Sequence, residues 1–266
     1  MSKSLLILLL IISVRILLHI SNNIENFMIE KYSINKYFDK IYVIVLEERR
    51  KYITDIMNKY NINPTYVDAV LKKNIDKKQL ISLNMLDINN TCEKNKKPLT
   101  DGQIACHLSH CKVLSDFLSG DSKNCLIFED DLLEPKYNLK YITYILENIN
   151  STLPNDYDIV FLGKCWEYCK YSVKLNNFLD KCYKPYCRHS YCVSRKGAEK
   201  ILKMTLPMKM SGDQMIANFI KDKQIIAYSS TPSIFYQNRN NLNSTIGNNF
   251  KNFDCMPGYS KSPNYN

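Results

Sequence analysis

Three consecutive acidic residues, Glu129, Asp130 and Asp131, follow a short apolar run at residues 125–128. A run of four to eight apolar residues is typical of a buried strand, and in open α/β sheets ligands bind at the carboxyl ends of the strands. Carboxylate oxygens at such a place suit Mg²⁺ or Mn²⁺, and these ions commonly bridge protein acids to nucleotide phosphates. The triplet alone leaves two interpretations open, a metal site or a solvated acidic turn before Pro135.

The elements that must position this triplet are predicted by the hydrophobic pattern around it. The β-branched run at residues 40–46 predicts a buried first strand, which a helix over 49–60 follows. Thr100 and Gln103 form a capping-box pattern that opens a helix through residue 117. Further strands are expected at 66–67, 159–162 (stopped by Gly163), 191–193 and 225–228, further helices at 139–149, 196–204 and 213–221, and an irregular, exposed segment at 71–97. Alternating strands and helices of this kind predict a three-layer α/β domain.

Composition excludes some classes of function. The chain has 266 residues, of which 45% are hydrophobic, and this is enough for one large α/β domain or two small ones. Lys and Arg outnumber Asp and Glu by 36 to 26, a formal charge of +10, which favours an anionic nucleotide donor or an acidic membrane surface. The basic residues are scattered, and no zinc-finger spacing or RNA-binding signature occurs. We therefore expect no nucleic-acid partner.

The N-terminus has the layout of a signal peptide or signal anchor, because residues 5–20 are almost continuously apolar. Arg15 and His19 interrupt the stretch, and a central Arg costs roughly 2.5–3.5 kcal/mol in a membrane helix. We expect residues 1–23 to direct the chain into the secretory pathway, in the endoplasmic reticulum or Golgi lumen. Cleavage, membrane attachment through residues 5–20, and a buried N-terminal helix all stay open.

Ten cysteines are compatible with an oxidising compartment. Five of them lie between residues 165 and 192, where we expect one or two disulfides bracing an irregular loop, with a zinc site as the weaker alternative. Cys106, Cys111 and Cys125 fall inside helix and strand patterns, which is typical of small buried thiols. Three sequons could carry glycans in a lumen: Asn89, Asn150 and Asn243.

Several separated blocks occur in a fixed order between about residues 40 and 237. These blocks are 41–46 with the pair Arg49-Arg50, then 101–110, 126–131, 158–163, 191–198 and 232–234. In their order and spacing they resemble glycosyltransferase family 25, which includes procollagen and lipooligosaccharide galactosyltransferases. The resemblance is carried by the ordered combination of these blocks.

The resemblance implies a GT-A type nucleotide-diphosphosugar transferase fold, three-layer α/β/α with a mostly parallel central sheet, at residues 38–240, followed by a polar tail at 241–266. It implies a metal-dependent, inverting enzyme that moves galactose or glucose from a UDP-sugar to a hydroxyl acceptor. The acceptor would be a protein, such as hydroxylysine of a collagen-like protein, or a glycan. The alternative is a catalytically inactive, lectin-like or adhesion module of the same fold. A metal-dependent phosphoesterase is a third hypothesis, which the small number of histidines disfavours.

The resemblance also implies roles for individual residues. Asp131, with Asp130, would hold Mn²⁺ or Mg²⁺ and so neutralise the diphosphate leaving group. Asp213 would be the base that removes the acceptor proton, although an ordinary helix cap is an equally good interpretation of this residue. Residues expected to contact the donor are Arg49, Arg50, Ser109, His110, Glu129 and Asp130.

Overall fold

The computed structural model describes residues 14–20, 32–92, 96–239, 242 and 253–258. Its centre is an eight-stranded sheet of order β2-β1-β3-β8-β5-β9-β7-β6. The strands are β1 (Lys40–Val45), β2 (Thr65–Asp68), β3 (Asn124–Glu129), β5 (Ile159–Cys165), β6 (Val173–Lys174), β7 (Leu179–Lys181), β8 (Tyr186–Ser194) and β9 (Ala227–Ser230). The helices are α2 (Arg50–Lys59), α3 (Lys77–Ser82), α4 (Asp101–Ser119), α5 (Leu139–Thr152), α6 (Arg195–Thr205) and α7 (Gly212–Lys221).

Strand direction in this sheet is mostly parallel. β1 pairs in parallel with β2 and β3, and β5 pairs in parallel with β9. β8 is antiparallel to both β3 and β5, while β7 is antiparallel to β9 and β6. Six of the eight strands therefore run in one direction, with β7 and β8 reversed. This confirms the predicted three-layer α/β architecture with a mostly parallel sheet.

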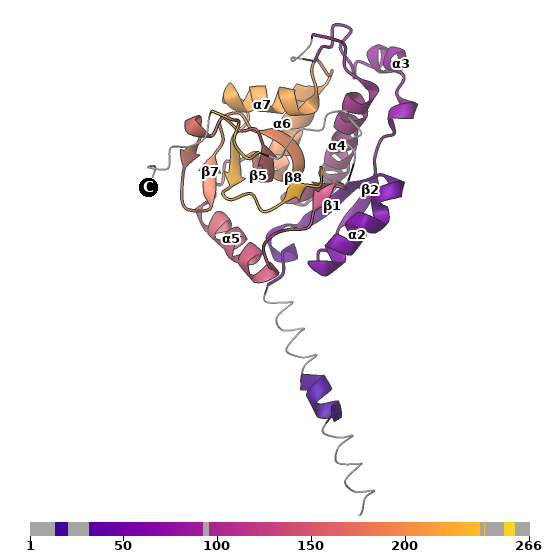
Figure 1. Cartoon of the computed structure of the whole chain (residues 1–266). Helices are drawn as coiled ribbons and strands as arrows, with labels where there is room; N and C mark the ends of the chain where they lie inside the picture. Colours follow the sequence, from indigo (N-terminus) through magenta and orange to yellow (C-terminus); the bar gives the residue numbers. More distant parts are fainter. Residues whose placement is uncertain (1–13, 21–31, 93–95, 240–241, 243–252, 259–266) are drawn as a thin grey trace, which may run out of the picture.

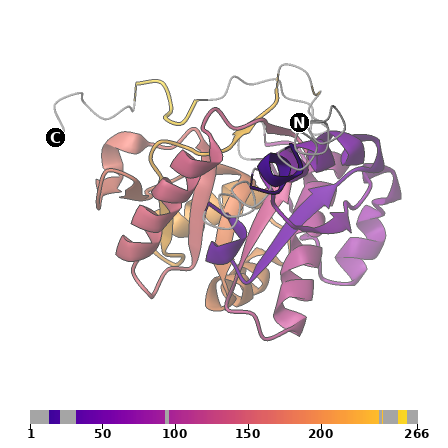
Figure 2. The same ribbon diagram turned by 90° about the horizontal axis from the view of Figure 1, so that it is seen from below.

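Both faces of the sheet are buried under helices, as the alternation of side chains along β1 illustrates. Ile41, Val43 and Val45 pack with apolar residues of α2 and α5, whereas Tyr42 and Ile44 pack with those of α4, α6 and α7. Successive side chains of a strand point to opposite faces, so an unbroken apolar run fills two cores. Figure 1 shows α4, α6 and α7 above the sheet, and Figure 2 shows the lower face with α2 and α5.

Most predicted elements are confirmed, including the first strand, the acidic strand end and the capping box at Thr100 and Gln103. The prediction that Gly163 stops its strand is wrong, because β5 continues to Cys165. A Cβ atom at Gly163 would lie 2.2 Å from the carbonyl oxygen of Phe235 and 2.3 Å from Nε2 of His189. Gly163 is thus a site of close packing within the strand.

The cysteine-rich segment forms two disulfides. Cys165 pairs with Cys187, and Cys169 pairs with Cys255 from the tail, which confirms the expected one or two bridges. The segment is less irregular than expected, since it contains β6, β7 and the start of β8. Two further cysteines of the segment, Cys182 and Cys192, carry no disulfide.

The two ends of the chain are described only in part. Residues 14–20 of the predicted leader are helical. The rest of the predicted leader, residues 1–13 and 21–23, lies outside the described residues. Within the described part of the chain, no helix combines the length and apolarity that a membrane span requires. At the other end, residues 253–258 pack against the domain, where Trp166 N donates to Phe253 O at 2.7 Å and Met256 N donates to Glu167 O at 2.8 Å.

Candidate active site

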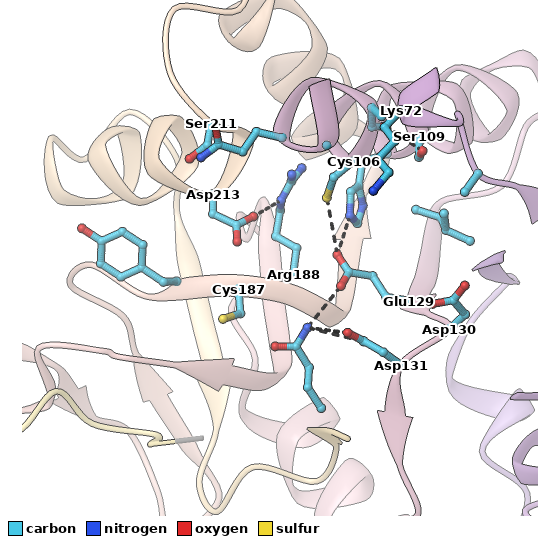
Figure 3. Close-up of a pocket in the computed structure, with 18 of the residues that line it drawn as sticks. Lys72, Cys106, Ser109, Glu129, Asp130, Asp131, Cys187, Arg188, Ser211 and Asp213 are labelled. Atoms are coloured by element: carbon cyan, nitrogen blue, oxygen red, sulfur yellow. Dashed lines mark hydrogen bonds and ion pairs between the residues drawn. The ribbon is translucent and has the colours of Figure 1, made fainter. Parts of the chain in front are cut away.

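A pocket of about 880 Å³ opens where the parallel strands end. It is lined by the chain just after β1, β2 and β3, by the first half of α4, by the start of α7 and by the start of the reversed strand β8. This is the edge at which α/β sheets bind ligands, and the volume lies in the range of small-molecule sites. Figure 3 shows the acidic triplet on one side of this pocket and Arg188 with Asp213 on the other.

The three acids of the triplet point in different directions. Asp130 turns toward the chain after β1, where its carboxylate accepts hydrogen bonds from Leu46 N at 2.6 Å and from Arg49 Nη1 at 3.0 Å. The Asp130 and Arg49 side chains are largely buried, at 9% and 12% exposure. Asp130 therefore ties the end of β3 to the start of the first crossover helix.

Glu129 and Asp131 instead converge on one amide. Gln237 Nε2 lies 3.3 Å from Glu129 Oε2 and 3.2 Å from Asp131 Oδ2. Gln237 is held there by β10 (Tyr236–Gln237), which pairs antiparallel with β4 (Leu132–Leu133) directly after the triplet. The carboxylates of Glu129 and Asp131 (Figure 3) thus face the same small volume, and the Gln237 amide lies between them.

Burial makes this pair of acids costly to ionise. Burial and the nearby carboxylate of Asp213 raise the pKa of Glu129 to about 7. Burial and the charge of Glu129 raise the pKa of Asp131 to about 7 as well. Two partly buried like charges disfavour each other, and a cation between them would relieve both the repulsion and the loss of solvation. The oxygens of Glu129 and Asp131 therefore fit a hard divalent ion such as Mn²⁺ or Mg²⁺.

Helix α4 presents Cys106 and His110 to the acidic triplet. These residues are four apart, hence on one face of the helix. His110 Nε2 lies 2.9 Å from Glu129 Oε1, and His110 Nδ1 lies 3.1 Å from the Tyr191 hydroxyl. Burial, with the positive charge of Arg188, holds the pKa of His110 well below its ordinary value. His110 is therefore a neutral imidazole fixed against Glu129. The sequence analysis predicted that His110 contacts the donor, and the residue does line the pocket.

Ser109 lines the pocket, but its hydroxyl is engaged with the protein. Its Oγ accepts from Val70 N at 2.8 Å and donates to Ala105 O at 2.7 Å. This contact fixes the segment that follows β2, which carries Lys72 and Lys73 to the pocket wall. Ser109 thus positions a basic loop.

The arginine pair after β1 is divided between the pocket and the surface. Arg49 lines the pocket. Arg50 is not among the described residues that line it, and its guanidinium instead lies against Glu47 and Asp68 on the exposed side of α2, at 2.8 Å and 2.5 Å. Of the two arginines predicted to contact the donor, only Arg49 is at the pocket.

Asp213 lies in the first turn of α7 and forms an ion pair with Arg188. Arg188 Nε lies 2.7 Å from Asp213 Oδ1, and the arginine side chain is only 2% exposed while that of Asp213 is 36% exposed. Gly212 permits this approach, since a Cβ there would lie 2.4 Å from both Arg188 Nη2 and His107 Nδ1. The candidate base is therefore at the pocket, with one side held by a buried cation.

Sequence patterns did not indicate the roles of Arg188 and Cys106. Cys106 and His110 are four residues apart in a predicted helix, and this spacing is a signal that could have placed the thiol beside the imidazole. Arg188 lies in the cysteine-rich segment, where no periodicity marks the start of a strand. Basic residues that also line the pocket are Lys72, Lys73, Lys184 and Arg239.

The sheet and the pocket at its carboxyl edge define an α/β domain consistent with a GT-A-like fold, the architecture of one class of glycosyltransferases. The chain belongs to glycosyltransferase family 25, whose model, described as a lipopolysaccharide biosynthesis family, matches residues 38–216. The matched segment contains the acidic triplet, α4 and Asp213.

Individual relatives agree with this assignment. The chain is 26% identical to human procollagen galactosyltransferase 2 over 183 residues, which are 66% of this chain and 29% of the relative. It is 25% identical to Xenopus laevis procollagen galactosyltransferase 1-A over 202 residues, 73% of this chain and 33% of the relative. A putative glycosyltransferase of Haemophilus influenzae is 30% identical over 207 residues, 74% of this chain and 69% of the relative. The chain thus spans about a third of the length of the procollagen enzymes that it matches.

Proposed function

We propose that this chain is a metal-dependent, inverting hexosyltransferase that uses a UDP-sugar and transfers galactose or glucose to a hydroxyl group. The observation that carries the proposal is the convergence of Glu129 and Asp131 on one amide, at the strand end of a family 25 fold. Galactose is the first candidate sugar because the named vertebrate relatives are galactosyltransferases.

Asp131 and Glu129 are the residues that would hold the ion, and Asp130 would position them. This division follows from the contacts, since the Asp130 carboxylate is occupied by Leu46 N and Arg49. Mn²⁺ or Mg²⁺, when bound, would neutralise negative charge on the departing diphosphate. Lys72, Lys73 and Arg49 line the same pocket and would bind the diphosphate oxygens by charge-assisted hydrogen bonds.

Asp213 would accept the proton of the acceptor hydroxyl. In an inverting transfer the hydroxyl oxygen attacks the anomeric carbon from the face opposite the diphosphate, the bond from that carbon to the diphosphate oxygen breaks, and the proton moves to a carboxylate. Asp213 has one oxygen fixed by Arg188 and a partly exposed side chain at the pocket. A base held in one orientation is what a positioned proton transfer requires.

The acceptor and the compartment are inferred from the disulfides and from the names of the relatives. Two disulfides suit an oxidising compartment, so we place the enzyme in the lumen of the secretory pathway. The acceptor would be a hydroxyl of a collagen-like protein, as the names of the relatives suggest, or of a glycan. A chain of the same fold that binds the donor without turnover is the alternative function.

The test is a screen of UDP-sugars for release of UDP by the purified chain, with Mn²⁺ and with a chelator. We expect release from at least one UDP-hexose with Mn²⁺ and its loss on chelation. Donor binding without release from any UDP-hexose, in the presence of collagen-like and glycan acceptors, would contradict the proposal and favour the inactive module.

A further inference from the structure

The pocket contains a second set of metal-ligating atoms, which is different in chemistry from the carboxylate pair. Cys106 Sγ, His110 Nε2 and a carboxylate oxygen of Glu129 all lie within 4.8 Å of one another. Figure 3 shows the Cys106 thiol pointing from α4 toward Glu129, and His110 of the same helix lies against Glu129. A thiol, an imidazole and a carboxylate are the ligand types that proteins use for zinc.

The two oxygens of Glu129 belong to different sets. Oε1 faces His110 Nε2 at 2.9 Å and Cys106 Sγ at 4.0 Å. Oε2 faces Gln237 Nε2 at 3.3 Å, on the side of Asp131. The group formed by Cys106, His110 and Glu129 therefore does not include Asp131. It uses Oε1 of Glu129, whereas Oε2 lies on the side of Asp131.

The distances are close to those of a tetrahedral site. With Zn–S of about 2.3 Å and Zn–N or Zn–O of about 2.0 Å, ligand atoms are separated by about 3.3–3.7 Å. The observed 2.9 Å between nitrogen and oxygen and 4.0 Å between sulfur and oxygen bracket this range. All three atoms lie within 4.8 Å of one another, so rotations of the Cys106 and Glu129 side chains are needed to bring them to one ion.

The surroundings also suit a bound cation. The Tyr191 hydroxyl contacts His110 Nδ1 at 3.1 Å and so fixes the ring with Nε2 toward Glu129, as outer partners do for metal-binding histidines. A thiolate and a carboxylate would balance the charge of a divalent ion. Arg188 is already neutralised by its ion pair with Asp213. The pocket side would leave a fourth coordination position open, as in exchangeable zinc sites.

We propose that Cys106, His110 and Glu129 form a binding site for a zinc-class cation, separate from the Mn²⁺ site of the transfer reaction. Binding at this site does not rest on the proposed function. One consequence does rest on it: because Glu129 is shared, a zinc-class cation here would perturb the carboxylate that faces Asp131 and would inhibit Mn²⁺-dependent transfer.

The direct test is titration of the purified chain, disulfides intact, with Co²⁺ as a spectroscopic substitute for Zn²⁺. A thiolate ligand gives a charge-transfer band in the near ultraviolet, and tetrahedral geometry gives intense visible bands. We expect both at one equivalent of Co²⁺, and their disappearance on addition of one equivalent of Zn²⁺. Cys106→Ser should lose the charge-transfer band and weaken Zn²⁺ binding by roughly 100-fold or more, beyond the 10- to 100-fold cost typical of outer-sphere changes.

Cys92→Ser is the matched control, because Cys92 also lines the pocket without a disulfide but lies outside the Cys106 group. It should keep the band. Cys106→Ala serves as a second variant, and circular dichroism of each variant reports its folding. A band that persists in folded Cys106→Ser, or a wild-type chain without any thiolate band, would overturn the proposal.

Inhibition is tested separately by the ratio of transfer rates with and without Zn²⁺ in wild type and Cys106→Ser. We expect the rate with Zn²⁺ divided by the rate without Zn²⁺ to lie well below one in wild type and close to one in Cys106→Ser. Equal inhibition of the two proteins would overturn the inhibitory consequence. A chain that shows the cobalt band but transfers no sugar would contradict the proposed function alone.

Discussion

Arg49 Nη1 lies 3.0 Å from Asp130 Oδ1, in an ion pair that joins the start of α2 to the residue that follows β3. Asp130 also accepts from Leu46 N at 2.6 Å. These contacts give Asp130 a structural role in the acidic triplet, whereas Asp131 faces Gln237 across the pocket. The two neighbouring acids should consequently respond differently to the same substitution.

Asp130→Asn should destabilise the fold. The amide cannot replace the charge that pairs with Arg49, and its NH2 group must face either the Leu46 N–H or the Arg49 guanidinium, both of which are donors. Loss of such partly buried contacts costs about 1–3 kcal/mol, which urea unfolding would measure. Glu134→Gln is the control, since the Glu134 side chain is 50% exposed in its pair with Lys59, and it should change the free energy of unfolding little. Equal stability of Asp130→Asn and wild type would contradict the structural role.

Asp131→Asn should change how the stability of the metal-free protein depends on pH. The pKa of about 7 for Glu129 and for Asp131 in the fold is above the ordinary carboxyl value near 4. The folded state therefore holds protons that the unfolded state has lost, so this contribution is fully present below about pH 4 and is lost as the pH rises through about 7.

We thus expect the melting temperature of the metal-free wild type to fall between about pH 5 and about pH 8, more steeply than that of Asp131→Asn. Mn²⁺ should restore wild-type stability at the higher pH by pairing with the ionised acids. Thermal melts across this pH range, with and without Mn²⁺, measure both effects. Parallel curves for the two metal-free proteins would show that Asp131 is ionised normally.

Asp213→Asn should reduce turnover and leave donor binding nearly unchanged. General-base catalysis contributes about 10²–10⁴-fold, so we expect kcat to fall by a factor of this size while the dissociation constant for UDP changes only a few-fold. Asp222→Asn at the opposite end of α7 is the control, because Asp222 is the exposed C-terminal cap of the helix. Turnover at the wild-type level in Asp213→Asn would assign the base elsewhere.

Cys255→Ser should destabilise the chain through loss of the bridge to Cys169. The bridge spans 86 residues, and disulfides of natural proteins typically contribute about 2–4 kcal/mol. Met256 and Trp166 line the pocket, and backbone hydrogen bonds join residues 253–256 of the tail to Trp166 and Glu167. Loss of the bridge should therefore also raise KM for a substrate. Cys92→Ser, which removes a thiol but no bridge, is the control for both measurements. Unchanged stability and KM in Cys255→Ser would contradict a role for the tail at the pocket.

Local sequence signals were sufficient for much of the fold. Apolar runs bounded by polar residues identified β1 and β3, and the Thr100 and Gln103 pair identified the start of α4. These signals succeed because each depends on residues adjacent in the chain. The end of β5 was mispredicted at Gly163, where the requirement for glycine comes from His189 and Phe235, both distant in sequence.

Local patterns predicted the candidate site where its residues lie at strand or helix ends, whereas Ser109 and His110 within α4 were predicted through the family resemblance. The triplet and Asp213 were found in this way, but the different orientations of Asp130 and Asp131 depend on Arg49 and Gln237, which come from two other parts of the chain. Arg188 reaches the pocket only because β8 runs against its neighbours, and a reversal of strand direction leaves no local signal.

The most direct test of the account is the rate of sugar transfer with Mn²⁺ in Asp131→Asn, measured beside wild type and Glu134→Gln under saturating UDP-sugar. We expect Mn²⁺-dependent transfer in wild type and in Glu134→Gln, and a loss of at least roughly 100-fold in Asp131→Asn, the size expected when charge stabilisation of a transition state is removed. Transfer by Asp131→Asn at the wild-type rate and with the same dependence on Mn²⁺ would contradict it.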